Sequence, residues 1–576
     1  MIEKSGIGVS NGFSSAKAFV LKNTNVRIEH RYVSDIDTEM ARLNKAIDES
    51  IDQIKKLKEE STNRIGEKNA SIFDAHLMMI NDETFRDRIK YFICDEKKDA
   101  VYAVDITKNE LKKTFDAIDD EYMRARSLDV CDISNRIIRN LMGETEVDIS
   151  SITEPMIILA HDLTPSDTAR IGNAPVVGFA TEIGGKTSHS AIIAAAMNIP
   201  AVTALGEGFI DEVKNGDLIL IDGRDGIVVV NPDDEAIRVF NKKKENYQKE
   251  INRLAMYKDR VGQTKEGERV IIEGNIGTVQ DVDKVIENGG EGVGLFRSEF
   301  LFIDKTTLPS EEEQYLAYKN VVEKFGDKPV IIRTLDIGGD KNAPALNLPK
   351  EENPFLGYRA IRICLHRPHF FKVQLRALLR ASVHGNLKIM FPMISSLEEL
   401  KAAKEILDEA KQELRDAGIS FNEKMRVGIM IEVPAAAISA RILAKYVDFF
   451  SIGTNDLIQY SLAVDRINEK VSNLYKPFHP SILRLIKMVA DAAKENKIEC
   501  GVCGEMAGSR GMAPILVGLG VSNLSMSASK ILRTKEFISK FSSDECKRIA
   551  EDMLNAEDAE TNQKYFDEKL KPLIGS

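Results

Sequence analysis

The segments VGIMIEV at residues 427–433 and FFSIGT at residues 449–454 decide the fold of this chain. Each segment is an apolar run of the length of one buried strand, with a polar residue at or near its end. Amphipathic helical stretches separate runs of this kind throughout the second half of the sequence. Apolar strands that alternate with helices are typical of a parallel sheet covered by helices.

Eight such runs follow one another from about residue 265 onward. The runs are Val270–Gly274, Gly292–Phe296, Val330–Thr334, Lys388–Met393, Val427–Val433, Phe449–Thr454, Cys500–Gly504 and Leu524–Ala528. Eight strand–helix units in about 300 residues predict a TIM (β/α)8 barrel, which usually takes about 250 residues plus insertions. An open doubly wound sheet is the alternative.

Polar residues collect at the ends of these apolar runs. They are Arg297, Arg333, Glu432, Asn455, Asp456, Cys503 and Glu505. The active site of a barrel lies at the C-terminal ends of its strands, so this pattern favours the barrel and locates a candidate site.

Four arginines belong to this candidate site. Arg297 and Arg333 end consecutive strands, and Arg359 and Arg466 lie in loops that follow strands. Guanidinium groups bind phosphate and carboxylate through two parallel hydrogen bonds. A single arginine would most simply be a surface or ion-paired residue, but several together indicate a small substrate with more than one negative charge.

Two carboxylates and one thiol add possible chemistry. Glu432 and Asp456 either form salt bridges with the arginines or hold Mg²⁺, which takes one or two carboxylates and completes its shell with substrate oxygens and water. Cys503 is either an inert buried thiol or, if it stays protonated, a general acid. The spacing of Cys500 and Cys503 matches a redox motif, but their place in a strand speaks against that function.

The pattern of apolar residues changes twice in the first half of the chain. Residues 1–21 hold two short apolar stretches, and residues 34–143 show helical periodicity that predicts a bundle of four or so helices. Residues 150–230 read as a compact α/β region that the first residues complete, and residues 232–260 as a connecting helix. The predicted domains are 1–21 with 146–231 (α/β), 22–145 (helical), 232–262 (linker helix) and 263–576 (barrel).

His189 is the sharpest feature outside the barrel. It follows two glycines, and the alanine-rich run after it is a strong helix former for which Thr187 or Ser188 is a plausible N-cap. A phosphoryl group on its ring would meet the free N–H groups and the positive end of the helix. A neutral imidazole is a good nucleophile near pH 7, although a lone histidine is more often structural. His76, by contrast, lies in a helical stripe and is most simply a packing or partner-contact residue.

Composition excludes several classes of protein. The 576 residues are 43% hydrophobic and 29% charged with a net charge of −11, and no long basic run occurs, so nucleic acid is not an expected partner. No apolar run approaches the ~18 residues of a membrane span, and the N-terminus resembles no signal segment. The six cysteines are sparse and irregular, which is not the pattern of a disulfide framework. A soluble, cytoplasmic protein is expected.

Several motifs together resemble one known family. The segment GGKTSHSAIIAAAMNIPAV at 184–202 closely resembles the phosphohistidine signature of Enzyme I of the bacterial phosphoenolpyruvate:sugar phosphotransferase system. The resemblance continues in FDAHLMMI (73–80), HDLTPSD (161–167), GLFRSEFLF (294–302), IIRTLDIGGDK (331–341), NPFLGYRAIR (353–362), IMIEVPAA (429–436), IGTNDLIQY (452–460), CGEMAG (503–508) and SMSA (525–528). These motifs stand in the family's order and cover essentially the whole chain.

The resemblance implies an activity and assigns residues to it. A phosphoenolpyruvate-protein phosphotransferase transfers a phosphoryl group from phosphoenolpyruvate to its own histidine, here His189, and then to the carrier protein HPr, which drives sugar uptake. Cys503 is implied as the proton donor that turns the leaving enolate into pyruvate, and Glu432 with Asp456 as the Mg²⁺ ligands. The residues implied in binding phosphoenolpyruvate are Arg297, Arg333, Lys341, Arg359, Asn455, Asp456 and Arg466.

The resemblance also implies partners. The helical segment 22–145 would bind HPr, the barrel would form a homodimer, and the α/β domain with His189 would swivel between the barrel and the carrier. Residues 509–512 depart from a stretch that is often acidic in the family, which puts only local detail in doubt.

Three other hypotheses remain open from the sequence. Pyruvate phosphate dikinase and phosphoenolpyruvate synthase share these domains, but they carry a large nucleotide-binding domain for which the 188 residues before His189 leave no room. A regulatory protein could sense phosphoenolpyruvate without turnover, although every matched catalytic position is filled. A nitrogen-regulatory paralogue typically carries an additional N-terminal sensory domain.

Overall fold

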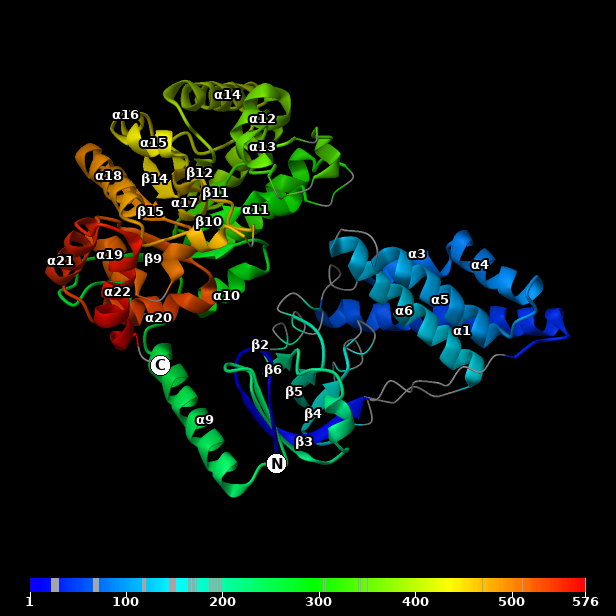
Figure 1. Cartoon of the computed structure of the whole chain (residues 1–576). Coiled ribbons are helices and arrows are strands. Elements are labelled where there is room, and N and C mark those ends of the chain that lie inside the picture. The colour runs from blue at the N-terminus through cyan, green and yellow to red at the C-terminus, as the bar shows by residue number, and fades with distance from the viewer. Residues whose placement is uncertain are drawn as a thin grey trace. The chain divides into compact units, whose positions relative to one another are not determined.

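The computed structural model in Figure 1 divides into two compact units, residues 1–249 and 250–576. The division falls inside the segment 232–262, and the four domain boundaries proposed from the sequence stay a prediction. The structure describes all residues except 22–30, 66–71, 117–120, 144–151, 164–166, 168–170, 172–173, 186–187, 189–190, 192–193, 195–196, 198, 304, 306, 340, 342, 350, 469, 510 and 575–576.

The second unit contains a closed barrel of eight parallel strands. Its strands are β9 (Ile271–Ile276), β10 (Val293–Arg297), β11 (Val330–Arg333), β12 (Leu387–Phe391), β13 (Arg426–Ile431), β14 (Phe449–Ile452), β15 (Glu499–Val502) and β16 (Asn523–Met526). Each strand pairs with the next along the chain, and β16 closes the ring onto β9. The predicted TIM barrel is confirmed, all eight predicted strands are present, and the open sheet is excluded.

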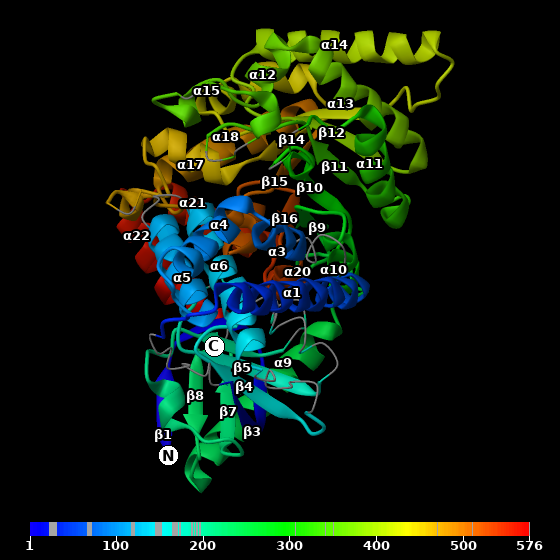
Figure 2. The ribbon, with the colours of Figure 1, turned by 90° about the vertical axis from the view of Figure 1, so that its right-hand side faces the viewer.

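Helices surround the barrel strands (Figure 2). The longer ones are α10 (Asp281–Glu287), α11 (Glu311–Phe325), α12 (Ile361–His366), α13 (Pro368–Ala381), α14 (Leu397–Asp416), α17 (Thr454–Leu462), α18 (Pro480–Asn496), α19 (Met512–Gly518), α20 (Ala528–Ile538), α21 (Ser543–Leu554) and α22 (Ala559–Tyr565). Shorter helices α15 (Pro434–Ile438) and α16 (Ala440–Leu443) follow β13. The strands are apolar throughout because one face packs on these helices and the other fills the barrel interior.

The first unit contains an eight-stranded mixed sheet in the order β1-β8-β7-β3-β4-β5-β6-β2. Its strands are β1 (Ile2–Ser5), β2 (Ile7–Ser10), β3 (Phe13–Leu21), β4 (Met156–Ala160), β5 (Val176–Thr181), β6 (Ala201–Thr203), β7 (Leu218–Asp222) and β8 (Ile227–Val230). Parallel pairing of β3 with β4 makes the chain between them an insertion in the sheet. The first 21 residues form three strands, not two. The sequence analysis missed β1 because this edge strand, Ile-Glu-Lys-Ser, has only one strongly apolar residue.

The insertion between β3 and β4 is helical. The helices that the structure describes there are α1 (Ile36–Ile65), α3 (Ile72–Ile80), α4 (Glu83–Cys94), α5 (Ala100–Asp116) and α6 (Glu121–Met142). Their apolar faces meet in one cluster that includes Leu43, Ile89 and Ile137. The predicted helical bundle is confirmed for the described residues.

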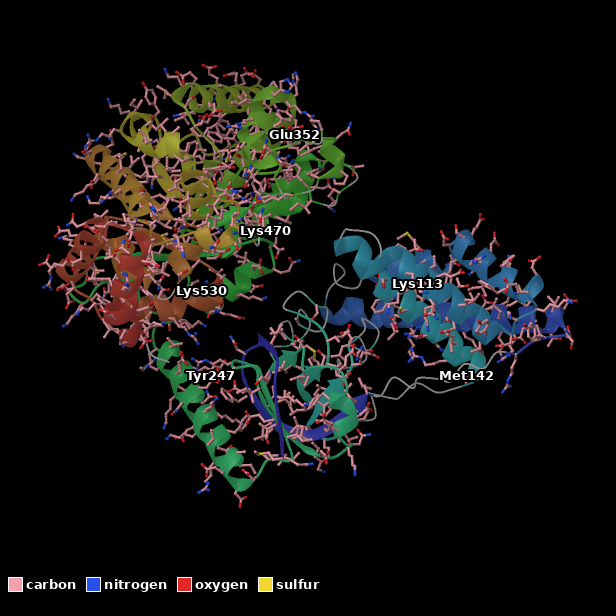
Figure 3. The ribbon with its side chains drawn as sticks, in the orientation of Figure 1. Lys113, Met142, Tyr247, Glu352, Lys470 and Lys530 are labelled. Carbon is pink, nitrogen blue, oxygen red and sulfur yellow. The ribbon has the colours of Figure 1, made fainter. Side chains whose placement is uncertain are left out.

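One long helix, α9 (Asp234–Ala255), belongs to both units. Near its start, Phe240 and Tyr247 pack against the ring of Phe13 in the first unit, with ring centroids 5.5 and 5.4 Å apart (Tyr247 is labelled in Figure 3). Near its end, Arg253 forms an ion pair with Glu536 in the second unit, with a 3.0 Å separation. The helical periodicity of 232–260 therefore predicted the element correctly.

Two expectations from composition can be compared with the structure. All six cysteines lie in the described part of the chain, and all are free thiols. No helix among the described residues is long and apolar enough to cross a membrane.

Candidate active site

The polar residues that the sequence places at strand ends do meet at one end of the barrel. Arg297 is the last residue of β10 and pairs in register with Arg333, the last residue of β11. Glu432 follows β13, Cys503 follows β15, and Asn455 and Asp456 lie in the first turn of α17 directly after β14. The short connection from strand to helix at each of these points aims the side chains at the barrel mouth.

Arg333 is buried between two carboxylates. Its guanidinium forms an ion pair with Glu299 and a second one with Asp336 at 2.9 Å. Burial by itself lowers the pKa of Arg333, yet the two neighbouring carboxylates outweigh it and raise the pKa. The guanidinium is therefore a permanent, oriented positive charge beneath the barrel mouth.

Asp336 joins three cations. Its carboxylate contacts Arg333 and Lys341 at 2.9 Å each and Arg359 at 2.8 Å. Burial opposes ionisation, but these three positive charges hold the pKa of Asp336 well below the usual range. Lys341 also reaches Glu299 at 2.8 Å, so the cations and acids form one continuous network.

Arg359 extends the network to α17. It donates to the hydroxyl of Tyr460 at 2.9 Å and lies 3.4 Å from the carboxylate of Asp456. Tyr460 in turn donates to the carbonyl of Phe355 at 2.6 Å, which fixes its hydroxyl as an acceptor toward Arg359. Burial raises the pKa of Tyr460 to about 12, so the phenol stays neutral.

Glu299, Asp336 and Tyr460 are site residues that the sequence analysis did not identify. Glu299 and Asp336 lie two and three positions after the arginines at 297 and 333, inside the very motifs that were singled out. Each acid is almost fully buried, and the ion pairs that it forms with residues the structure describes are all to cations of the site. The signal in the sequence that could have identified them is an acidic residue two or three positions after an arginine at a strand end.

Glu432 is the carboxylate best placed to hold a cation together with Asp456. It is 2% exposed, and one oxygen accepts from the backbone N–H of Met393 at 2.7 Å. Burial raises the pKa of Glu432 to about 8, and the nearby negative charges of Asp456 and Asp336 add to the effect. Buried carboxylates that repel one another are stabilised by a bound cation, so this donor set of oxygens fits Mg²⁺.

A larger ligand cluster is not found. Among the described residues, no group of three or more histidine, cysteine or acidic side chains is arranged to hold a metal ion. A pair of carboxylates is nevertheless sufficient for Mg²⁺ that shares its coordination shell with substrate oxygens.

Cys503 directly follows β15 and lies in the barrel interior at its mouth end. It is 2% exposed and packs with Leu295, Met390 and Met430 in the barrel interior. Burial raises the pKa of its thiol to about 11, although a hydrogen bond from Ser451 lowers it in part. The thiol is therefore protonated at neutral pH and is available as a proton donor.

Two arginines of the site carry no carboxylate partner in the described part of the chain. Arg297 is exposed, and Arg466 is half-buried. Asn455 uses its side-chain oxygen to accept from the N–H of Glu505 at 3.1 Å, which leaves its amide donors toward the mouth. These groups can meet an anionic ligand without first breaking a salt bridge.

His189 lies outside the described residues, so the structure gives no position for its ring. The flanking residues agree with the predicted local structure. Gly184 has φ +116°, and the hydroxyl of Ser188 accepts from the N–H of Ala191 at 3.3 Å, as an N-cap does. His161 and the buried Glu182 form a hydrogen bond of 2.7 Å that the sequence did not suggest.

His76 is a buried residue of the helical bundle. Its ring is 1% exposed and lies 3.2 Å from Asp129 and 3.8 Å from Asp132, both on α6. This burial agrees with the simpler interpretation of His76 as a packing residue.

Comparison with known proteins identifies relatives along the whole chain. Three family models match: "PEP-utilising enzyme, N-terminal" over residues 5–126, "PEP-utilising enzyme, mobile domain" over 152–226 and "PEP-utilising enzyme, PEP-binding domain" over 252–543. Proteins named phosphoenolpyruvate-protein phosphotransferase are similar over nearly full length. The one from Priestia megaterium is 46% identical over 94% of both chains, and the one from Geobacillus stearothermophilus is 46% identical over 96% of both. The Bacillus subtilis protein is 44% identical over 99% of this chain and 100% of its own.

Proposed function

This chain belongs to the family of phosphoenolpyruvate-protein phosphotransferases, and we propose that it passes the phosphoryl group through His189 with the barrel mouth as its phosphoenolpyruvate site. As a member of that family it is the general enzyme of the phosphotransferase system. The observation that carries the residue-level proposal is the convergence of five cations on the mouth that contains Cys503. They are Arg297, Arg333, Lys341, Arg359 and Arg466.

Phosphoenolpyruvate carries a phosphate and a carboxylate, so it needs several positive charges and oriented donors. Arg297 and Arg466 are the cations without ion pairs among the described residues, and they bind the substrate directly. Arg333, Lys341 and Arg359 are held in place by buried acids. Because these side chains are already oriented, they can stabilise the negative charge that develops during phosphoryl transfer. They do not have to change position as the reaction proceeds.

Glu432 and Asp456 hold Mg²⁺ in this proposal. When bound, Mg²⁺ would supply positive charge for phosphoryl transfer. Burial raises the pKa of Glu432 and the negative charge of Asp456 raises it further, so a cation bound beside the two carboxylates would stabilise them.

The proton and the phosphoryl group leave the substrate site by different routes. Cys503 gives its thiol proton to the methylene carbon of the enolate, which becomes the methyl group of pyruvate. The imidazole of His189 accepts the phosphoryl group, because a neutral histidine is nucleophilic near pH 7. The phosphohistidine then transfers the group to the carrier protein.

We place the docking surface of the carrier, HPr, on the helical insertion. Met78 on α3 is 69% exposed, so its apolar side chain is available to a partner. Met78→Asp should raise the KM for the carrier and leave the first turnover of phosphoenolpyruvate unchanged. Met142→Asp, also on an exposed methionine of the bundle, is the matched control (Figure 3 labels Met142). Equal effects of the two substitutions would remove Met78 from the docking surface.

Homodimerisation through the barrel unit and a cytoplasmic location complete the proposal. Ile438 and Ile442 are 66% and 53% exposed, and they lie four positions apart on α15 and α16. Such a stripe supports a self-association surface. Ile442→Glu should shift the sedimentation coefficient from dimer to monomer, and an unchanged coefficient would place the interface elsewhere.

The activity is tested by following both products at once. The purified chain receives phosphoenolpyruvate, Mg²⁺ and HPr, and pyruvate and phosphorylated carrier are measured together. Equal amounts of the two products are expected. Pyruvate without phosphorylated carrier would contradict the transfer step, and phosphoenolpyruvate binding without either product would favour a sensor.

A further inference from the structure

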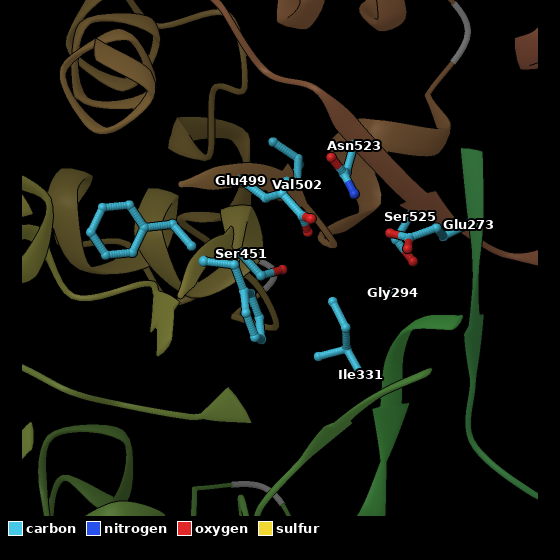
Figure 4. Close-up of a pocket in the computed structure, with 11 residues that line it drawn as sticks. Glu273, Gly294, Ile331, Ser451, Glu499, Val502, Asn523 and Ser525 are labelled. Carbon is cyan, nitrogen blue, oxygen red and sulfur yellow. The ribbon is translucent and has the colours of Figure 1, made fainter. Parts of the chain in front are cut away.

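The barrel interior has a polar side that the phosphoenolpyruvate site does not use. One part of the interior is apolar and contains Leu295, Ile331, Met390, Met430 and Phe449 beside Cys503. The other part is a row of polar side chains around a small cavity (Figure 4). We call this row the polar seam; its members are Glu273, Asn275, Ser451, Glu499, Asn523 and Ser525.

Glu273 is the central residue of the seam. Its side chain is 2% exposed, and no hydrogen bond to its Oε1 is formed by any residue that the structure describes. Asn523 lines the same cavity as this carboxylate. A buried carboxylate oxygen without a donor is costly, so a ligand in the cavity would stabilise it.

Gly294 makes the room for this carboxylate. A Cβ atom at position 294 would lie 2.7 Å from Oε2 of Glu273 and 2.5 Å from Oγ of Ser525. The cavity that remains has room for about one water molecule, and its polar lining supplies the two or more hydrogen-bond partners that a buried water needs.

The seam reaches Cys503 at its upper end. Ser451 lines the cavity and directly precedes Ile452, whose carbonyl accepts a hydrogen bond from the thiol of Cys503 at 3.7 Å. On the opposite side, Ser525 donates to Asn275 at 2.5 Å, and Asn275 donates to the carbonyl of Cys503 at 2.8 Å. The thiol of Cys503 therefore lies next to the strand that lines the cavity, and its backbone carbonyl is hydrogen-bonded to the seam.

The seam reaches solvent at its lower end. Glu499 begins β15 and forms ion pairs with Lys388 at 2.8 Å and Arg426 at 2.6 Å. The side chains of Glu499 and Arg426 are 34% and 37% exposed, so protons can exchange with water there. The barrel floor thus opens to solvent on the side away from the phosphoenolpyruvate site.

The charges around Glu273 suit it to hold a proton. Burial raises the pKa of Glu273 to about 7; the negative charges of Glu499 and Glu291 also raise it, and Lys388 lowers it. Near neutral pH the group is present in both protonation states, so it can release a proton and regain it from solvent.

We propose that the polar seam returns a proton to Cys503 after each turnover, with Glu273 as the group that stores it and a water in the cavity as the link to Ser451. This inference rests on the proposed role of Cys503 as the proton donor. Because Glu273 and Ser451 act through Cys503 and do not touch the substrate, they are positioning residues and not catalytic ones.

The proton movements balance. The S–H bond of Cys503 breaks and a C–H bond of pyruvate forms, which leaves a thiolate. Ser451 gives its hydroxyl proton to that sulfur and takes one from the cavity water, and the water takes the carboxylic proton of Glu273. The carboxylate of Glu273 is then protonated from solvent by way of Glu499. Every step is a proton transfer, so no group is oxidised or reduced and no further reactant is needed.

The seam matters because Cys503 is almost fully buried beneath the substrate. A thiolate near Glu432 is unfavourable, and the raised pKa of the thiol means that it takes up any available proton. A proton that arrives from the barrel floor can reach Cys503 before the product has left the barrel mouth.

The test separates the first turnover from later ones. The full chain with Mg²⁺, phosphoenolpyruvate and excess carrier is followed by rapid-quench measurement of pyruvate. In Glu273→Gln the first turnover should keep its wild-type rate, since Cys503 starts protonated, and later turnovers should be slower by roughly tenfold or more. The wild-type steady-state rate should fall as pH rises through about 7, and the variant should lack this pH dependence.

Two further variants complete the experiment. Ser451→Ala keeps Glu273 but breaks the link to the thiol, so it should show the same fast first turnover and slow later ones, even if Glu273→Gln does not fold. Glu423→Gln, a matched substitution that removes a solvent-exposed carboxylate paired with Arg415 outside the seam, should behave as wild type.

Two outcomes would overturn the reasoning at different levels. If Glu273→Gln and Ser451→Ala both keep the wild-type steady-state rate while Cys503→Ala loses it, the proton returns through the mouth and the seam has no such role. If Cys503→Ala also releases pyruvate at the wild-type rate, the assignment of the proton donor in the proposed function is wrong.

Discussion

Asp336→Asn isolates the contribution of the buried charge network. The substitution keeps the shape of the side chain and removes a negative charge that contacts three cations at 2.8–2.9 Å. Removing one partner of a buried ion pair typically costs about 3–5 kcal/mol. Glu299 still pairs with Arg333 and Lys341, and Asp456 with Arg359, so the loss should match one broken pair and not three.

The assay is the free energy of unfolding of the barrel unit in the full chain. Urea titration with protease digestion and mass spectrometry of barrel peptides reports on that unit alone. Glu423→Gln removes the carboxylate of a solvent-exposed pair with Arg415 and should cause no measurable loss. A loss for Asp336→Asn that is no larger than in this control would refute the view that the network is held together by its buried acids.

The pH dependence of the same variant provides a second check. The pKa of Asp336 is lowered in the folded state, so its stabilisation is fully present above the unfolded value of about 3.8. This stabilisation is lost as the pH falls through the pKa of Asp336 in the folded state, which lies below the unfolded pKa. The difference in stability between wild type and Asp336→Asn should therefore be constant from pH 8 to about 5 and should narrow below about pH 4. A difference that already narrows above pH 6 would contradict the assignment.

Three other predictions concern the barrel mouth. Cys503→Ala should lower the rate of pyruvate release by roughly 10²–10⁴-fold and leave the Kd for phosphoenolpyruvate, measured by calorimetry, nearly unchanged. In wild type the raised thiol pKa should keep the donor protonated before the first turnover, so the first-turnover rate should show no alkaline loss from Cys503 below about pH 10. Arg297→Ala should weaken phosphoenolpyruvate binding by about 1.5–3 kcal/mol without changing the melting temperature, and an unchanged Kd would remove Arg297 from the site. Gly504→Ala should destabilise the barrel by about 1–3 kcal/mol in denaturant titrations, since the new Cβ would lie 1.9 Å from Oγ1 of Thr454; wild-type stability would show that α17 can move away.

Much of the barrel could be predicted from the sequence because its strands are buried on both faces. Such strands are continuous apolar runs, and their polar residues stand out at the ends where the mouth forms. The edge strand β1 could not be predicted in this way, since half of its residues face solvent and its pattern is too short to distinguish from a loop.

The candidate site was predicted only in part. Strand-end position identified the arginines, Glu432 and Cys503, but it gave no reason to choose Glu299 or Asp336, whose importance comes from contacts between different strands. The polar seam could not be predicted from the sequence either, because it also depends on contacts between different strands. Glu273 and Gly294 are adjacent only because β9 and β10 pair, and an isolated glutamate in an apolar strand gives no sign of its neighbours.

The most direct test of the account is to identify the residue that receives the phosphoryl group. The full chain is incubated with ³²P-labelled phosphoenolpyruvate and Mg²⁺ without carrier, and the acid-labile label is mapped by peptide mass spectrometry. The account predicts one phosphoryl group on the peptide that contains His189, lost in His189→Ala and kept in the control His369→Ala. Label on another residue, or no label on a folded protein, would contradict the proposed transfer through His189.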